Sequence, residues 1–135
     1  MTQTVFTTLT RVYYEDTDMA GVVYYANYLK YIERGRSDML RQLHIDQAIL
    51  KERYALVFVV RNVTAHYHAP AVFDNELTIE TRPQKIRGAS IQVMQKILHK
   101  DRLLFSAEVG LVCVGVTDFK PARLPPQIVD KLNRT

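Results

Sequence analysis

Residues 16–36 read DTDMAGVVYYANYLKYIERGR, with two carboxylates, Asp16 and Asp18, ahead of a glycine and an apolar run. Behind them, apolar or small residues recur every three or four positions, at 28, 32, 35, 39 and 43. This spacing predicts a helix over residues 24–43 with one apolar face. Gly35 on that face costs about 1 kcal/mol in helix propensity against Ala, so we expect another backbone to pack closely there.

Strand patterns flank this helix on both sides. Residues 6–14 are rich in Thr, Val and aromatic residues and predict a first strand. A helical turn or two is expected at residues 45–53, and a short terminal helix at 125–132. Further strands are predicted at residues 55–68, 75–86, 90–99 and 103–116. Because short turn signals separate them, we expect antiparallel neighbours in a meander.

One amphipathic helix and one antiparallel sheet bury each other's apolar sides, which predicts a single two-layer α+β domain spanning residues 1–135. A curved sheet around a central helix, the hot-dog arrangement, fits this order, although the pattern alone fits other α+β sandwiches. The single cysteine, Cys113, lies in the apolar run VGLVCVGV and is expected to be buried and unpaired. No leader peptide or apolar run near 20 residues is visible, so a cytoplasmic location without a transmembrane segment is expected.

The charge balance favours anionic partners. The chain carries 18 Lys and Arg against 14 Asp and Glu, a net charge of +4. Arg82, Lys85 and Arg87 fall within the segment RPQKIRG and form a candidate phosphate site. A nucleic-acid binder is a weak alternative, because the glycine and aromatic run of an RNA-recognition motif is missing.

Several common chemistries are excluded by missing motifs. No GxxxxGK[ST] loop, GxGxxG turn or GxSxG elbow occurs. His66 and His68 share one face of a predicted strand, but without a third ligand we expect no metal and no cofactor. Asp16 and Asp18 remain, and either one could simply cap the helix or close the turn. Next to a helix N-terminus, with its partial positive charge, a carboxylate could instead take part in catalysis.

The 29-residue segment 12–40, VYYEDTDMAGVVYYANYLKYIERGRSDML, resembles the signature of the hot-dog thioesterases of the 4-hydroxybenzoyl-CoA thioesterase type. It is most similar to the Tol-Pal-associated acyl-CoA thioesterases. FVVRN near Phe58 and DNELTIET at 74–81 extend the resemblance. It implies the hot-dog fold, hydrolysis of an acyl-CoA to acid and CoA, and a homodimer joined edge to edge or a homotetramer, with active sites at the subunit boundary.

The resemblance also implies which residues act. Asp18 would be the nucleophile or the general base, and the backbone N–H of Tyr25 would polarise the thioester carbonyl, an effect worth roughly 3 to 4 kcal/mol in comparable oxyanion sites. Many Tol-Pal-associated relatives have His where this chain has Tyr25, so the backbone role is expected rather than a side-chain role. Lys85, Arg87 and Ser90 correspond to the nucleotide-binding edge, although an ordinary solvated turn explains them equally well.

Some alternatives stay open at this level. The same fold could serve as a scaffold that binds acyl carrier protein with little catalysis. Glu33 and Arg36, one helical turn apart, are expected to pair, with an active-site role for Glu33 as the weaker option. The acyl group could be short or aromatic. An aromatic set could line its pocket or fill a dimer interface: Tyr13, Tyr14, Tyr24, Tyr25, Tyr28, Tyr31 and Phe58.

Overall fold

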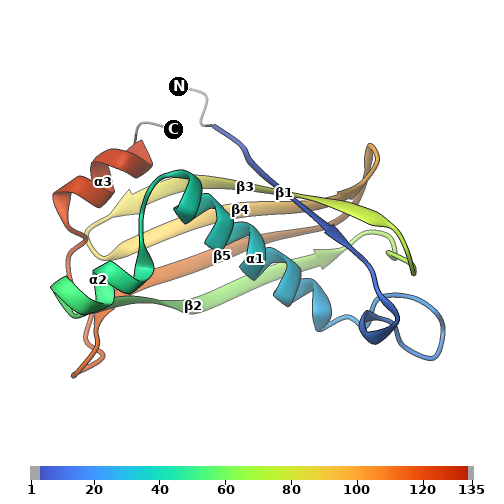
Figure 1. The fold of residues 1–135 in the computed structure, drawn as a ribbon, viewed down its shortest axis with the longest axis horizontal. Helices are drawn as coiled ribbons and strands as arrows, with labels where there is room; N and C mark the ends of the chain where they lie inside the picture. The colour runs from blue at the N-terminus through green and yellow to red at the C-terminus, as the bar shows by residue number, and fades with distance from the viewer. Residues whose placement is uncertain (1–3, 134–135) are drawn as a thin grey trace.

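The computed structural model describes residues 4–133, which form one antiparallel sheet and three α-helices (Figure 1). The strands are β1 (Phe6–Arg11), β2 (Leu56–Tyr67), β3 (Glu76–Arg87), β4 (Ser90–His99) and β5 (Arg102–Gly115). The helices are α1 (Asn27–Gln42), α2 (Gln47–Tyr54) and α3 (Pro126–Asn133), with a 3₁₀ turn η1 (Tyr14–Asp16). The sheet curves around α1, so the predicted α+β hot-dog architecture is confirmed.

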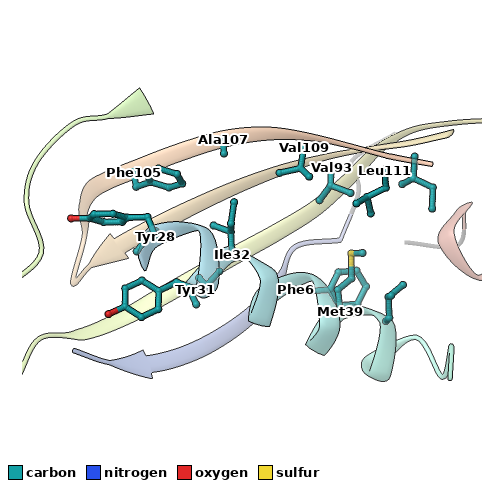
Figure 2. Close-up of a cluster of buried hydrophobic side chains, with 14 of the residues drawn as sticks. Phe6, Tyr28, Tyr31, Ile32, Met39, Val93, Phe105, Ala107, Val109 and Leu111 are labelled. Atoms are coloured by element: carbon teal, nitrogen blue, oxygen red, sulfur yellow. The ribbon is translucent and has the colours of Figure 1, made fainter. Parts of the chain in front are cut away.

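The core lies between α1 and the concave face of the sheet. The periodic face of the predicted helix is buried, with Ile32 and Met39 each 1% exposed. On β4, Ile91, Val93 and Ile97 alternate with more exposed neighbours, as the sequence pattern predicted. Figure 2 shows Ile32 and Met39 of α1 on one side of the core and Val93 of β4 on the other. Cys113 is fully buried, as expected, and burial raises the pKa of its thiol.

The strand order corrects the predicted meander. The sheet runs β1-β3-β4-β5-β2, so β2 and β3, consecutive in the chain, do not pair. The connection over residues 68–75 instead crosses the end of the sheet. It is held there because Ala71 donates its N–H to the Tyr28 hydroxyl (3.0 Å), and Ala71 C=O accepts the N–H of Val23 (2.9 Å). This crossover brings the end of β2 to the beginning of α1.

Two predicted boundaries at the same end of the molecule were wrong. The strand expected over residues 6–14 stops at Arg11, because the chain turns into η1. The helix expected over residues 24–43 starts at Asn27. Tyr24 is not helical, because its N–H donates to Asp16 C=O (2.9 Å) while its own C=O accepts the Asn27 N–H (2.8 Å). Among residues 4–133, no helix is both long and apolar enough to span a bilayer.

Gly35 has the close packing that its position predicted. A Cβ at this residue would lie 2.7 Å from both Ile79 Cγ2 and Thr81 Oγ1. Beside it, the Gln95 amide is buried and donates to Ile32 C=O (2.8 Å) and to Thr81 Oγ1 (2.9 Å). The helix backbone therefore rests directly on β3 and β4.

The predicted Glu33–Arg36 pair does not form. Arg36 turns inward and donates to Gln95 Oε1 (3.0 Å), and burial lowers the pKa of its guanidinium. Glu33 accepts instead from the Ser37 hydroxyl (3.1 Å). The long-range amide partner from β4 outcompetes the local ion pair, since a half-buried guanidinium needs an acceptor more than an exposed one does.

Replacing Gly35 with Val should lower the free energy of unfolding by about 2 to 3 kcal/mol, because the added side chain overlaps β3. Lys30→Val is the matched control on the exposed side of α1 and should cost less than about 0.5 kcal/mol. Urea unfolding followed by circular dichroism measures both variants. A Gly35→Val protein as stable as wild type would show that the helix and sheet are not in contact there.

Candidate active site

Asp18 lies on a tight loop that precedes α1. Its N–H donates to Val22 C=O (2.9 Å), and its C=O accepts the Gly21 N–H (3.0 Å). Thr17 forms a β-bridge with Val23, so the two arms of the loop run antiparallel. Gly21 has φ +81°, a conformation that favours glycine and lets the loop reverse within so few residues. The short spacing between Asp18 and the glycine is therefore a requirement of the turn.

The Asp18 carboxylate is anchored by one oxygen only. Oδ1 accepts the N–H of Ala20 (2.9 Å) and, more weakly, that of Val22 (3.4 Å). The turn-closing role considered from the sequence is thus correct. The side chain is exposed, and none of residues 4–133 donates to Oδ2. A carboxylate oriented through Oδ1 presents Oδ2 for another contact.

Asp16 has a different task. Its C=O accepts both the Tyr24 N–H (2.9 Å) and the Asn27 side-chain amide (2.9 Å), and its Oδ2 accepts the Tyr13 N–H (2.8 Å). Burial and the nearby Asp16 carboxylate raise the pKa of the Tyr31 hydroxyl, with burial the larger cause. Asp16 therefore ties the loop to the first turn of α1 but caps η1 rather than that helix.

The Tyr25 N–H is an unpaired donor held in a fixed direction. Within the described chain it donates to no other residue. The peptide before it is fixed because Tyr24 C=O accepts the Asn27 N–H (2.8 Å). The peptide after it is fixed because Tyr25 C=O accepts the Tyr67 hydroxyl (3.0 Å). α1 begins two residues later, and Ala26 provides no side-chain cap, so the partial positive charge of the helix end is not neutralised locally.

Tyr25 forms part of the wall of a cavity of about 350 Å³. Tyr28 stacks on Phe105, with ring centroids 5.1 Å apart, and Tyr67 packs edge-on against the same ring at 5.0 Å. Figure 2 shows Tyr28 and Phe105 side by side at this end of the core. The lining residues are Val23, Tyr25, Tyr28, Tyr67, His68, Ala69 and Pro70. Tyr25 and Tyr28 thus line a pocket. For the aromatic set, the sequence had left open a pocket or a dimer interface.

The other aromatic residues of that set lie elsewhere. Tyr13 and Tyr14 are exposed, and Tyr14 stacks on Phe73 with ring centroids 4.2 Å apart. Tyr31 is buried in the core, whereas Phe58 is partly buried against it. Asp18 does not line the cavity in the subunit. It is adjacent to Thr17, whose bridge partner Val23 does line it.

Sequence reasoning did not identify Tyr67 and His68 as site residues. The sequence held a partial signal for Tyr67 only: the alternation of β2 places Tyr67 on the face opposite His66 and hence toward the core. The alternation could not predict the crossover after β2, which places the end of β2 next to the start of α1. Burial is the main cause that raises the pKa of the Tyr67 hydroxyl, followed by Tyr25 and Tyr28.

A second hollow gathers the three predicted nucleotide-binding residues. Lys85, Arg87 and Ser90, at the β3–β4 turn, line a cavity of about 310 Å³. Its other lining residues are Arg61, Asn62, Ile91, Gln92, Gly110 and Leu111. Three cationic side chains and no carboxylate therefore surround it. Arg82, the remaining basic residue of the segment, lies outside this hollow.

The register of the sheet aligns residues of four strands along this hollow. Four residues stand in one row across β3, β4, β5 and β2: Lys85, Gln92, Gly110 and Asn62. Bulges interrupt β2 and β3 directly beside the row, at residues 61 and 84. A Cβ on Gly110 would collide with Asn62 Oδ1, so the glycine makes room for the Asn62 side chain.

Comparisons with known proteins identify the family of this chain. The thioesterase-like superfamily matches residues 12–132. The acyl-CoA thioester hydrolase YbgC of Escherichia coli O6:H1 is 47% identical over 131 residues, 96% of each chain. The acyl-CoA thioesterase YbgC of Haemophilus influenzae is 39% identical over 118 residues, 87% of each chain.

Two solved structures have the same fold. A probable thioesterase from Bartonella henselae has a TM-score of 0.86 and 39% identity, and the match covers 90% of this chain and 100% of that one. Slr0204, a 1,4-dihydroxy-2-naphthoyl-CoA thioesterase from Synechocystis, has a TM-score of 0.88 at 22% identity, over 96% of each chain, and is similar in fold. The chain belongs to the thioesterase-like superfamily.

Proposed function

We propose that this protein is an acyl-CoA thioesterase, which hydrolyses an acyl-CoA to the free acid and CoA without a metal or organic cofactor. The observation that carries the proposal is the unpaired Tyr25 N–H, fixed through both flanking peptides on the wall of an aromatic cavity. The names of the YbgC relatives, at 47% and 39% identity, support the same chemistry.

The geometry fits the electrostatic demand of this reaction. When the thioester carbonyl becomes tetrahedral, its oxygen gains negative charge, and a fixed N–H near a helix N-terminus stabilises that charge by roughly 3 to 4 kcal/mol. Because the donor needs no reorientation, the stabilisation is present as the charge develops. The C–S bond then breaks, and the electron pair leaves with the sulfur of CoA.

Asp18 is the proposed acidic partner of Tyr25. Its free Oδ2 can attack the carbonyl to give a mixed anhydride, or it can orient a water molecule for attack. Oδ1 is held by the turn, so the carboxylate keeps one direction in either route. The carboxylate lies outside the cavity of its own subunit, and this agrees with an active site completed at a subunit boundary.

We propose that β2 forms that boundary by pairing edge to edge with β2 of a second copy. The two edges of the sheet are β1 and β2. β2 is the longer edge and exposes apolar side chains, with Val60 48% and Val63 39% accessible. An exposed apolar edge of this length favours pairing with another strand. A homodimer, or a homotetramer of two such dimers, would cover it.

We further propose that Lys85, Arg87 and Ser90 bind the phosphates of CoA. The hollow they line contains a third cation, Arg61, and lacks carboxylates, so an anionic group would be stabilised there. Arg61 comes from β2, the strand next to the proposed dimer boundary. A nucleotide bound in the hollow would therefore be held by three strands of the same sheet, β2, β3 and β4.

For the acyl group we propose a short aliphatic chain or an aromatic ring. A cavity of about 350 Å³ walled by Tyr25, Tyr28 and Tyr67 fits a flat or short group better than a long chain. Cytoplasmic location and association with the Tol-Pal system stay predictions of the family resemblance.

Replacing Asp18 with Asn should lower kcat by about 10² to 10⁴-fold with little change in KM, since the charge is lost while Oδ1 can still close the turn. Glu15→Gln, an exposed neighbour, is the matched control and should keep wild-type activity. Hydrolysis of benzoyl-, short-, medium- and long-chain acyl-CoAs measures both.

The same panel separates the enzyme from the alternative of a scaffold that binds acyl carrier protein. Wild type and Asp18→Asn proteins with equal, background-level rates on every substrate would support the scaffold. A preference of wild type for long acyl chains would contradict the proposed acyl group but leave the activity in place.

The double variant Lys85→Ala, Arg87→Ala should raise KM for acyl-CoA about 10-fold and leave kcat within about 2-fold, because the lost contacts, about 1.4 kcal/mol together, lie far from the thioester. Acyl-pantetheine, which lacks the nucleotide, should be hydrolysed equally by both proteins. Lys100→Ala, in the β4–β5 turn, serves as the control. An unchanged KM for acyl-CoA would refute the phosphate site.

A further inference from the structure

Tyr67 stands where the aromatic cavity meets the core. It is the last residue of β2, and its side chain lines the cavity. Its ring packs against three other rings, with centroids 5.0, 5.3 and 6.4 Å away: Phe105, Tyr28 and Tyr25. Phe105 is fully buried and is not among the lining residues. The Tyr67 ring therefore separates the cavity from Phe105 and closes this end of it.

The inner face of β2 continues past Tyr67 with smaller side chains. In the register of β2 and β5, Tyr67 stands opposite Phe105, and the next inward pair is Ala65 opposite Ala107. Figure 2 shows Ala107 following Phe105 along β5. The next inward residue of β2, Val63, is 39% exposed, so this part of the inner face is not covered in the subunit. An apolar path thus begins directly behind the Tyr67 ring.

The Tyr67 side chain is held at its far end as well as along its ring. Its hydroxyl donates to Tyr25 C=O (3.0 Å), which ties it to the segment that enters α1. A phenol ordinarily titrates near pH 10, and burial raises the pKa of this hydroxyl further, so it remains a donor at neutral pH. A ring fixed in this way cannot swing aside unless the hydrogen bond to Tyr25 breaks.

The other two tyrosines of the wall are placed differently. Tyr28 is 3% exposed, and its hydroxyl accepts the Ala71 N–H (3.0 Å), so it is a core residue that also holds the crossover. Tyr25 is 62% exposed, so its ring encloses less of the cavity. Of the three, Tyr67 is the one that lies on β2 in front of the small side chain of Ala65.

We propose that Tyr67 is the specificity-determining residue of the acyl cavity, where its ring stops the acyl group before the path over Ala65 and Ala107. This inference rests on the proposed thioesterase function. A short chain or a single flat ring ends against Tyr67 with its thioester carbonyl at the Tyr25 N–H. A longer chain has to displace the ring, or else its carbonyl stays away from that donor and reacts slowly.

Replacing Tyr67 with Ala should extend the substrate range to longer acyl chains, because the cavity then continues along Ala65. The ratio of kcat/KM for octanoyl-CoA to kcat/KM for butanoyl-CoA should rise about 10-fold or more, since one methylene in an apolar pocket changes discrimination by about 10- to 200-fold. Tyr54→Ala is the matched control: Tyr54 is 47% exposed, against 50% for Tyr67, but lies on α2. It should keep the wild-type ratio.

Tyr67→Phe separates the ring from the hydroxyl. The ring still closes the cavity, so the ratio should stay within about 2-fold of wild type, whereas kcat on both substrates should fall a few-fold because Tyr25 C=O loses its donor. A purely structural role of Tyr67 would lower stability in Tyr67→Ala and leave the ratio unchanged, and that result would overturn the proposal. An equal rise of the ratio in Tyr67→Phe would also overturn it, since the hydroxyl would then set the length.

The outcomes distinguish this inference from the proposed function. If Asp18→Asn is inactive and Tyr67→Ala keeps the wild-type ratio, the thioesterase function stands and the role of Tyr67 is refuted. If wild type hydrolyses neither substrate, the thioesterase function fails, and the ratio of Kd values for butanoyl- and octanoyl-CoA, measured by calorimetry on the same variants, decides whether Tyr67 limits the chain. Should Tyr67→Ala not fold, Tyr67→Val, which suits a strand better, replaces it with the same expected shift.

Discussion

The backbone carbonyl of Asp16 is the point on which the site depends. It accepts two hydrogen bonds, from the Tyr24 N–H and from the Asn27 side chain, and so ties the Asp18 loop to the first turn of α1. Because Tyr24 is held in this turn, its own carbonyl accepts the Asn27 N–H, and the next N–H, that of Tyr25, has no hydrogen-bond partner among residues 4–133. The unpaired donor is thus a consequence of how the loop enters the helix.

The strand order supplies the rest of the site. β2 lies at the far edge of the sheet from β3, so the chain must cross the end of the sheet to connect them. In Figure 1 the loop before α1 and this connection lie at the same end of the molecule, and α2 and α3 lie at the other. The crossover brings Tyr67 and His68 beside Tyr25, and the Tyr67 hydroxyl fixes the peptide that follows the donor. A site distributed over three segments is therefore positioned by one sheet.

Local patterns in the sequence were enough to predict most of the helices and strands and some of the site residues. The helical periodicity predicted the buried face of α1, and Gly35 predicted its close approach to the sheet. The bounds of β4 were correct, since both of its ends are turn signals. Contacts between residues far apart in the sequence could not be predicted from local patterns. The neighbours of β2 in the sheet depend on the crossover, and Arg36 donates to Gln95, 59 residues away in sequence, instead of pairing with Glu33. Tyr67 and His68 were missed for the same reason.

The central claim is that the Tyr25 N–H stabilises the oxyanion of thioester hydrolysis. The most direct measurement replaces Tyr25 with its α-hydroxy acid, so that an ester oxygen takes the place of the N–H while the tyrosine side chain and carbonyl remain. The account predicts that kcat falls by about 10² to 10³-fold with KM nearly unchanged, as for the loss of an oxyanion donor. A protein with the ester that turns over acyl-CoA at the wild-type rate would contradict it.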